Sequence, residues 1–190
     1  MKTLEQENRT KRLIPIAILL PFILYSSFFI LNLFRADVSF NTGEQAQRYG
    51  LDEVAAEYYQ EAITRNPREP RYHRELAYVL ARQGIVEKAE REAEAAYNLN
   101  PKNSLTVRSL ISTYVDLSDI DDKYLARAEE LITEAIAQQP TNPQLYYEQA
   151  LILFKSEKDG EAVEALQKAL ELKKDYKEVQ NLLEEIAHPR

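Results

Sequence analysis

Three segments of the chain end in the same way, with an alanine, four further residues and a proline. The prolines are Pro67, Pro101 and Pro140, of which the first two stand 34 residues apart and the last two 39 residues apart. A second alanine precedes each of these alanines by seven residues, and a fourth pair follows 34 residues after the third. Such a recurrence predicts one supersecondary unit that is repeated along the chain. The alanine pairs are Ala55 and Ala62, Ala89 and Ala96, Ala128 and Ala135, and Ala162 and Ala169.

The spacing of the alanines predicts helices that pack closely. Residues seven apart lie on one face of an α-helix, and small side chains there let a neighbouring helix approach. Between the two alanines stand Tyr59, Ile132 and Leu166 in three units and Ala93 in the second, so a larger side chain usually fills the adjoining gap. The proline ends its helix, because it lacks an amide hydrogen and restricts the residue before it. With only 4 glycines and no cysteine in 190 residues, the chain is predicted to be all-α.

This pattern resembles the tetratricopeptide repeat, a pair of antiparallel helices in about 34 residues. The first helices of the units add matches at Leu76, Ala77, Leu110, Ile111, Tyr146 and Ala150, and depart from the pattern at His73 and Gln149. The resemblance implies an α-solenoid of helical hairpins with a concave groove that holds a protein segment. We expect four units, at 36–69, 70–103, 104–142 and 143–176, followed by a capping helix at 177–187.

An uncharged stretch of 22 residues from Leu13 to Phe34 predicts a transmembrane helix, because about 20 apolar residues cross a bilayer core. Four Lys or Arg residues precede the stretch, and only Arg35 follows it closely. The positive-inside tendency therefore places residues 1–12 in the cytoplasm, as a disordered tail, and residues 36–190 on the extracytoplasmic side of the membrane.

Two alternatives remain open for this segment. A cleaved signal peptide would have a shorter apolar core of about 7 to 15 residues and a small-residue cleavage site, which "NLFRAD" does not supply. The polar opening of the first unit follows the span directly, so the membrane helix can also continue into the repeats.

Charge and motifs argue against several function classes. Residues 36–190 carry a formal charge of −10, whereas residues 1–35 carry +3. Because nucleic-acid-binding proteins usually present a basic face, the acidity of residues 36–190 does not favour a nucleic-acid partner. The sequence has no glycine-rich phosphate loop, no nucleophile elbow and no cysteine. We therefore expect a non-enzymatic protein without a cofactor or a metal.

The residue types that most often carry chemistry have plainer explanations here. His73 holds a packing position of the repeat, and His188 lies in the tail. The aspartates of 116–122 lack the central glycine and final glutamate of a calcium loop. Asp121 or Asp122 is instead expected to cap the helix that follows.

The resemblance also indicates which side chains face the groove, since the first helix of each unit lines it through repeat positions 2, 5, 9, 12 and 13. Arginines there suit carboxylates, and tyrosines suit extended backbone, so the expected partner is an acidic or polar extended segment. Alternatively, the arginines pair with neighbouring glutamates such as Glu75. The expected groove residues are Arg48, Arg71, Arg74, Tyr78, Arg82, Arg108, Ser112, Tyr147 and Phe154.

Some relatives hold the terminal carboxylate of a chaperone tail with lysines and asparagines on their first helices. That constellation is missing, because the corresponding positions carry Phe40, Glu44, Arg71, Leu105 and Ser109.

Residues 34–77 and 140–179 also resemble the region where O-antigen ligase or polymerase family membrane proteins pass from their last span into a C-terminal repeat domain. The leading hypothesis is a membrane-anchored scaffold that binds another protein through its groove, in envelope or surface-polysaccharide assembly. The alternative is an accessory subunit or detached C-terminal domain of such a glycan enzyme. A further kind of partner is a second copy of the chain, bound through repeat faces.

Overall fold

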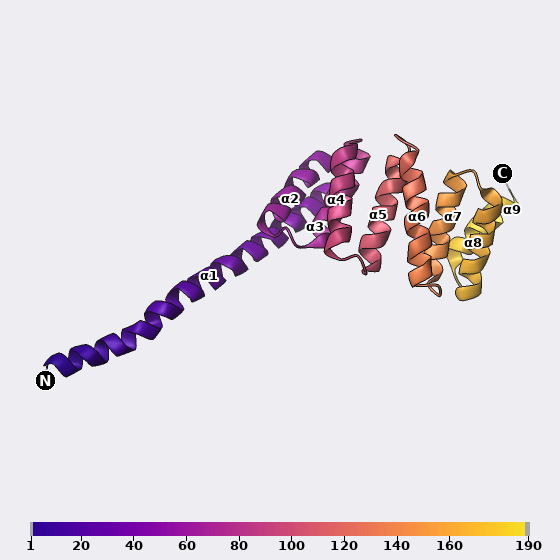
Figure 1. Ribbon diagram of the computed structural model, residues 1–190. Helices are drawn as coiled ribbons and strands as arrows, with labels where there is room; N and C mark the ends of the chain where they lie inside the picture. The colour runs from indigo at the N-terminus through magenta and orange to yellow at the C-terminus, as the bar shows by residue number, and fades with distance from the viewer. Residues whose placement is uncertain (1, 189–190) are drawn as a thin grey trace. The chain divides into compact units, whose positions relative to one another are not determined.

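A computed structural model describes the backbone of residues 2–188 and the side chains of residues 19 and 21–188. This part of the chain is all-α, as predicted, and holds nine helices (Figure 1). The chain divides into two compact units, Met1–Arg68 and Glu69–Arg190. The helices are α1 (Lys2–Arg48), α2 (Asp52–Arg65), α3 (Pro70–Arg82), α4 (Val86–Leu99), α5 (Ser104–Leu117), α6 (Lys123–Gln138), α7 (Pro143–Lys155), α8 (Asp159–Leu172) and α9 (Lys177–Ala187).

The first unit consists of α1 and α2, which form an antiparallel hairpin. α1 is one continuous helix from Lys2 to Arg48, so the apolar segment and the first helix of the repeats are not separate elements. Residues 1–12 were predicted to be disordered, yet the backbone is helical from Lys2 onward. Once a helix is nucleated, extending it costs little, and this segment is rich in Glu, Gln, Lys and Arg, which favour helices.

The apolar half of α1 faces outward within its unit. Phe22, Phe28 and Phe34 expose 68%, 63% and 66% of their surface. The stretch Pro21–Arg48 is long and apolar enough to cross a membrane, judged by length and composition, and 11% of its most apolar window is buried. A signal sequence passes the same test, and so does a core helix, although a core helix would be mostly buried. The side chains of residues 13–18 and 20, in the first part of the predicted span, lie outside the described residues.

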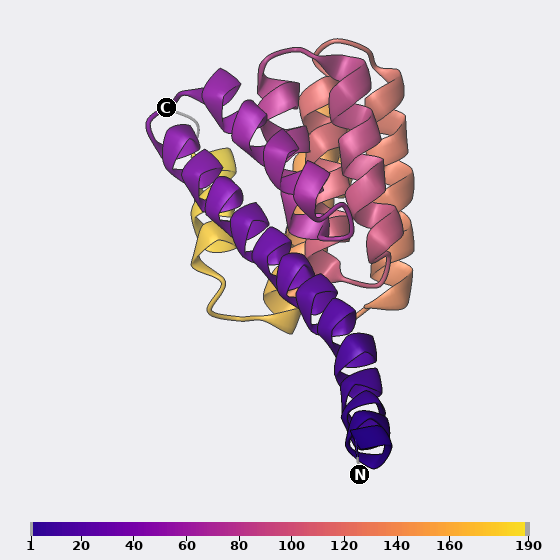
Figure 2. The same cartoon turned by 90° about the vertical axis from the view of Figure 1, so that its left-hand side faces the viewer.

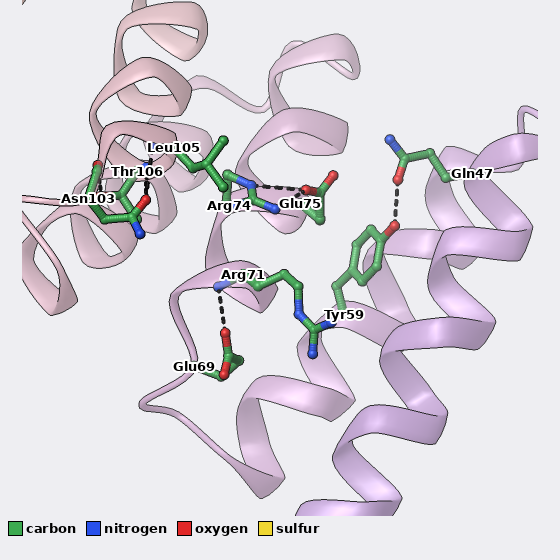
Figure 3. A network of polar contacts seen from close by, with 9 residues as sticks. All are labelled: Gln47, Tyr59, Glu69, Arg71, Arg74, Glu75, Asn103, Leu105 and Thr106. Carbon is green, nitrogen blue, oxygen red and sulfur yellow. Dashed lines mark hydrogen bonds and ion pairs between the residues drawn. The ribbon is translucent and has the colours of Figure 1, made fainter.

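Close approach holds the α1–α2 hairpin together. Gly43 lies against the ring of Tyr59, and a Cβ atom built on it would stand 2.7 Å from Tyr59 Cε1 and 3.3 Å from the Ala55 carbonyl oxygen. Tyr59 is fully buried, its ring centroid lies 5.4 Å from that of Phe40, and its hydroxyl donates to Gln47 Oε1 at 2.5 Å (Figure 3).

The second unit is a row of helical hairpins in which each helix packs on its neighbours along the chain (Figures 1 and 2). The hairpins α3–α4, α5–α6 and α7–α8 begin at Pro70, Ser104 and Pro143, where the sequence places the starts of the last three units. All eight alanines of the recurrent pairs are buried, with at most 6% of their surface exposed. The residues between them, Tyr59, Ala93, Ile132 and Leu166, are buried as well. The packing role predicted for the small residues is therefore confirmed.

Local sequence explains where these helices begin and turn. Pro70 and Pro143 occupy the first turns of α3 and α7, where a proline costs no hydrogen bond. Asn103 accepts from the backbone amide of Leu105 at 2.8 Å and so caps α5 (Figure 3). Gly84, between α3 and α4, has a φ of 71°, which glycine adopts readily.

α9 closes the last apolar face of the second unit. Tyr176 and Val179 are buried, with 5% and 0% exposure, in a cluster with residues of α7 and α8. Leu182 and Leu183 are partly buried and pack against the same cluster. Without these side chains, the apolar surface of the α7–α8 hairpin would face water.

Candidate functional site

A cleft of about 210 Å³ lies between α5 and α7, the first helices of two consecutive hairpins. Residues three or four apart share a face of a helix, so each helix presents a short row of side chains to this cleft. The row on α5 is Arg108, Ile111, Ser112 and Val115, and the row on α7 is Glu148, Leu151 and Ile152. Four of the seven lining residues are aliphatic, so the cleft suits an apolar side chain with a polar neighbour.

One wall of the cleft is an ion pair. Arg108 donates from Nε to Oε1 of Glu148, whose side chain is 15% exposed. Oε2 of Glu148 is buried and has no hydrogen-bond partner among the described residues. Because Glu148 is mostly buried, its charge is poorly hydrated and depends on Arg108 for compensation.

The polar chain continues from this pair along α7. Gln144 donates from Nε2 to Oε1 of Glu148 at 3.3 Å, and the Tyr176 hydroxyl donates to Oε1 of Gln144. Hydrogen bonds thus link α5, α7 and the residue that precedes α9. Side chains joined in this way restrict one another's rotamers, which fixes the wall of the cleft.

Charged groups also gather at the C-terminal ends of α5 and α7. Lys155 Nζ lies 2.6 Å from Asp119 Oδ1. The pKa of Asp116 is raised, chiefly because burial disfavours its charged form; Lys155 opposes that rise and Asp119 adds to it. This end of the two helices therefore carries both signs of charge.

The structure places all nine predicted groove residues on α1, α3, α5 or α7, the first helices of their hairpins. Of these, Arg108 and Ser112 line the cleft together. Arg48 is exposed at the C-terminal end of α1, in the first unit. The remaining predicted residues lie on α3 and α7.

On α3, the predicted residues interact largely with one another or with a neighbour. Arg74 donates from Nε and Nη2 to Oε1 of Glu75, at 3.0 and 2.9 Å (Figure 3). The guanidinium of Arg82 lies 5.6 Å from the ring centroid of Tyr78. Arg74 therefore pairs with Glu75, and Arg108 pairs with Glu148. For these two arginines, pairing with a glutamate is the observed arrangement.

The two predicted aromatic residues of α7 pack within their own hairpin. Tyr147 lies with its ring centroid 5.7 Å from that of Tyr176, and both Tyr147 and Phe154 pack against the buried cluster of α7, α8 and α9. Neither residue lines the cleft.

Sequence reasoning did not single out the aliphatic lining. Val115 and Leu151 hold repeat positions 12 and 9, the same rule that selected the arginines, so attention to apolar residues at these positions would have found them. Glu148 stands outside that rule, and nothing in its local sequence marks it as the partner of Arg108.

Polar groups outside the cleft have structural partners. His73 is 7% exposed, and its Nδ1 lies 2.6 Å from Oε2 of Glu92. Of the two aspartates predicted to cap α6, Asp121 accepts from the backbone amide of Lys123 at 3.0 Å, whereas Asp122, which holds the N-cap position, makes no side-chain capping bond. Within the described residues, no group of three or more His, Asp or Glu side chains is placed to hold a metal ion.

A family model of the tetratricopeptide repeat matches residues 53–104 and 125–177. Among solved structures, residues 41 to the end of MamA from Desulfovibrio magneticus RS-1 are similar, with 19% identity, a TM-score of 0.59, and coverage of 76% of this chain and 79% of that chain. A thermophilic TPR protein of Thermus thermophilus gives 21% identity, a TM-score of 0.61, and coverage of 73% and 75%. PilF of Pseudomonas aeruginosa gives 21% identity, a TM-score of 0.61, and coverage of 78% and 65%. At these identities the structures show a shared fold. The comparison with curated proteins finds no match.

Proposed function

The chain belongs to the tetratricopeptide-repeat family, whose helical hairpins are a protein-interaction fold, and we propose that it is a membrane-tethered module that binds an extended segment of another protein. The observation that carries this proposal is the cleft between α5 and α7, with its aliphatic lining. An apolar side chain of the partner that enters the cleft leaves water and contacts the aliphatic side chains of Ile111, Val115, Leu151 and Ile152.

The polar wall supports an extended occupant. Arg108 and Ser112 border the aliphatic lining, so a bound segment meets hydrogen-bonding groups beside its apolar anchor. On α3, the exposed Arg71 and Arg82 occupy groove positions of the repeat and supply positive charge for acidic or polar positions of the same segment.

Membrane attachment is proposed on the basis of α1. Its outward-facing aromatic and aliphatic side chains would lie in lipid, and the positive residues before them favour a cytoplasmic N-terminus. Residues 36–190 would then meet partners outside the cytoplasm, as in cell-envelope assembly. The resemblance to O-antigen ligase and polymerase proteins stays a prediction, because the matching family model is that of the repeat alone.

A pair of single substitutions tests the cleft. Leu151→Glu places a charge in the aliphatic lining at a residue that is 41% exposed, so the fold should tolerate it. Ile120→Glu is the matched control, at a residue that is 56% exposed in the α5–α6 connection. Cross-linking of the full chain in its native membranes should recover the same partner with wild-type and Ile120→Glu, and lose it with Leu151→Glu. Equal recovery with both variants would overturn the assignment of the cleft.

Two further measurements test the tether. Alkaline carbonate extraction should leave the full chain in the membrane pellet, and protease added to sealed cells should digest residues 36–190. Release of the chain by carbonate would exclude a spanning α1. Protection from the protease would reverse the proposed orientation.

A further inference from the structure

The register of the α1–α2 hairpin fixes which end of α2 lies next to the apolar part of α1. Phe40 of α1 lies beside Tyr59 of α2, with their ring centroids 5.4 Å apart, and Gly43 of α1 lies against Tyr59 and the Ala55 carbonyl of α2. Since the two helices are antiparallel, continuing this register brings the last turn of α2 level with Arg35. The last turn of α2 thus ends where the uncharged stretch of α1 ends.

The dimensions of a bilayer predict where the end of α2 lies relative to the lipid headgroups. The headgroup layer on each side of the hydrocarbon core is about 5 to 8 Å thick, which corresponds to about three to five helical residues at 1.5 Å each. If the apolar stretch that ends at Phe34 fills the core, residues 35–39 stand in the headgroup layer. The last turn of α2 and the connection 66–68 then stand there too.

Charge is distributed unevenly along this hairpin. The membrane-proximal end carries Arg35, Arg65 and Arg68, together with Asp37 and Glu61. Arg65 Nη2 lies 2.6 Å from Glu61 Oε1, and Arg65 Nε is buried with no hydrogen-bond partner among the described residues. Arg35 and Arg68 are exposed. The far end of the hairpin carries Arg48 with four acidic residues, which are Glu44, Asp52, Glu53 and Glu57.

We propose that this basic end, Arg35 with Arg65 and Arg68, binds the phosphate groups of anionic lipids, so that α2 stands on the bilayer surface beside the span. Guanidinium groups bind phosphate through paired hydrogen bonds, and basic residues next to a span are attracted to anionic lipid. The inference rests on the proposed membrane tether. It adds that the end of α2 makes a second contact with the lipid surface, beside the span itself.

The test uses the full chain in lipid nanodiscs. Because the sequence has no cysteine, one introduced cysteine gives one labelled site. Thr64→Cys and Glu53→Cys are a matched pair of exposed positions on α2, about 16 Å apart along the helix. Each carries a fluorophore, and a spin label on lipid headgroups quenches fluorophores near the membrane surface. Strong quenching is expected at Thr64→Cys and little at Glu53→Cys.

Lipid composition and a second pair of variants test the charge. Quenching at Thr64→Cys should rise when phosphatidylglycerol replaces part of the phosphatidylcholine. Arg68→Gln should reduce that rise, by about fivefold in the ratio of docked to undocked hairpin. Arg48→Gln removes the same charge at the far end and should leave the rise unchanged.

The outcomes separate the two proposals. A chain that fails to insert into nanodiscs would overturn both the tether and the lipid contact. An inserted chain with equal quenching at both sites, or with Arg68→Gln behaving like Arg48→Gln, would overturn the lipid contact and leave the tether in place. Greater quenching at Thr64→Cys that responds to anionic lipid and to Arg68 supports the proposal.

Discussion

Arg108 on α5 donates a hydrogen bond from Nε to Oε1 of Glu148 on α7, 40 residues further along the chain. This bond joins the first helices of two hairpins and forms one wall of the cleft. An ion pair at this place links neighbouring hairpins, and a segment bound as proposed would lie beside its charged groups.

Removal of one partner of this pair should cost more than removal of a surface pair. Arg108→Ala leaves the largely buried Glu148 carboxylate uncompensated, so we expect the free energy of unfolding to fall by about 1–3 kcal/mol. The double variant Arg108→Ala, Glu148→Ala should lose less than the sum of the single variants. Lys155→Ala is the control, since its partner Asp119 is 74% exposed, and should cost under about 1 kcal/mol. Urea unfolding of the full chain in detergent measures the wild type and the four variants, and additive losses would show that the two side chains are not coupled.

Gly43 should tolerate a side chain poorly, because it lies against the ring of Tyr59. Gly43→Ala places a Cβ atom 2.7 Å from the ring of the fully buried Tyr59, and such overpacking costs about 1–3 kcal/mol. Gly160→Ala, in the first turn of α8, has no heavy atom within 4 Å of the new Cβ and should gain up to about 1 kcal/mol from helix propensity. Hydrogen exchange of the α2 amides should be faster in Gly43→Ala and unchanged in Gly160→Ala. Unchanged hydrogen-exchange protection in both variants would mean that the Tyr59 ring can move aside without destabilising the hairpin.

The recurrent alanines allow a comparison within one helix. Ala128 and Ala126 both lie on α6, but Ala128 is fully buried and Ala126 is exposed. Ala128→Leu should lower the free energy of unfolding by about 1–3 kcal/mol through overpacking, whereas Ala126→Leu should change it by less than about 0.5 kcal/mol. Thermal unfolding followed by circular dichroism distinguishes the two. A stable Ala128→Leu variant would contradict the close helix contact on which the repeat depends.

Helix positions in the second unit were largely predictable, because short-range chemistry marks them. Pro70 and Pro143 start helices, Gly84 turns the chain, and alanines seven apart identify the buried face. The continuity of α1 was left open, because the residues after Phe34 are polar but no proline stands between Phe34 and Arg48. A helix with no stop signal continues, and α1 does so to Arg48.

The cleft was predictable only in part. Arg108 and Ser112 followed from their repeat positions, but the pairing of Arg108 with Glu148 depends on the separation of two helices that are distant in sequence. A guanidinium on a flexible stem reaches several neighbours, and the local sequence of Arg74 offers Glu75 while that of Arg108 offers no carboxylate within four residues. Sequence position therefore identifies the helix face, while packing between hairpins selects the partner.

Two buried tyrosines should make the second unit sensitive to alkaline pH. Tyr114 donates to Oε1 of Glu94 at 3.0 Å, Tyr124 donates to Oε2 of Glu90 at 2.8 Å, and their stacked rings lie 5.8 Å apart. Burial, and then the neighbouring carboxylate, raise the pKa of both phenols above the ordinary value of 10.0.

Each phenol has a higher pKa in the folded chain than in the unfolded chain. Its contribution to stability is therefore complete at a pH below the unfolded-chain pKa, and it is lost as the pH rises from that value toward the folded-chain pKa. We therefore expect stability to fall above about pH 10, with tyrosinate absorbance from these two residues rising only as circular dichroism shows unfolding. Tyr114→Phe removes one of the groups whose ionisation drives unfolding, so it should move the alkaline midpoint upward. It should also cost about 1 kcal/mol at neutral pH, where the bond to Glu94 is lost. Ionisation of all 12 tyrosines together near pH 10, with the helices still folded, would contradict the burial and hydrogen bonding of Tyr114 and Tyr124.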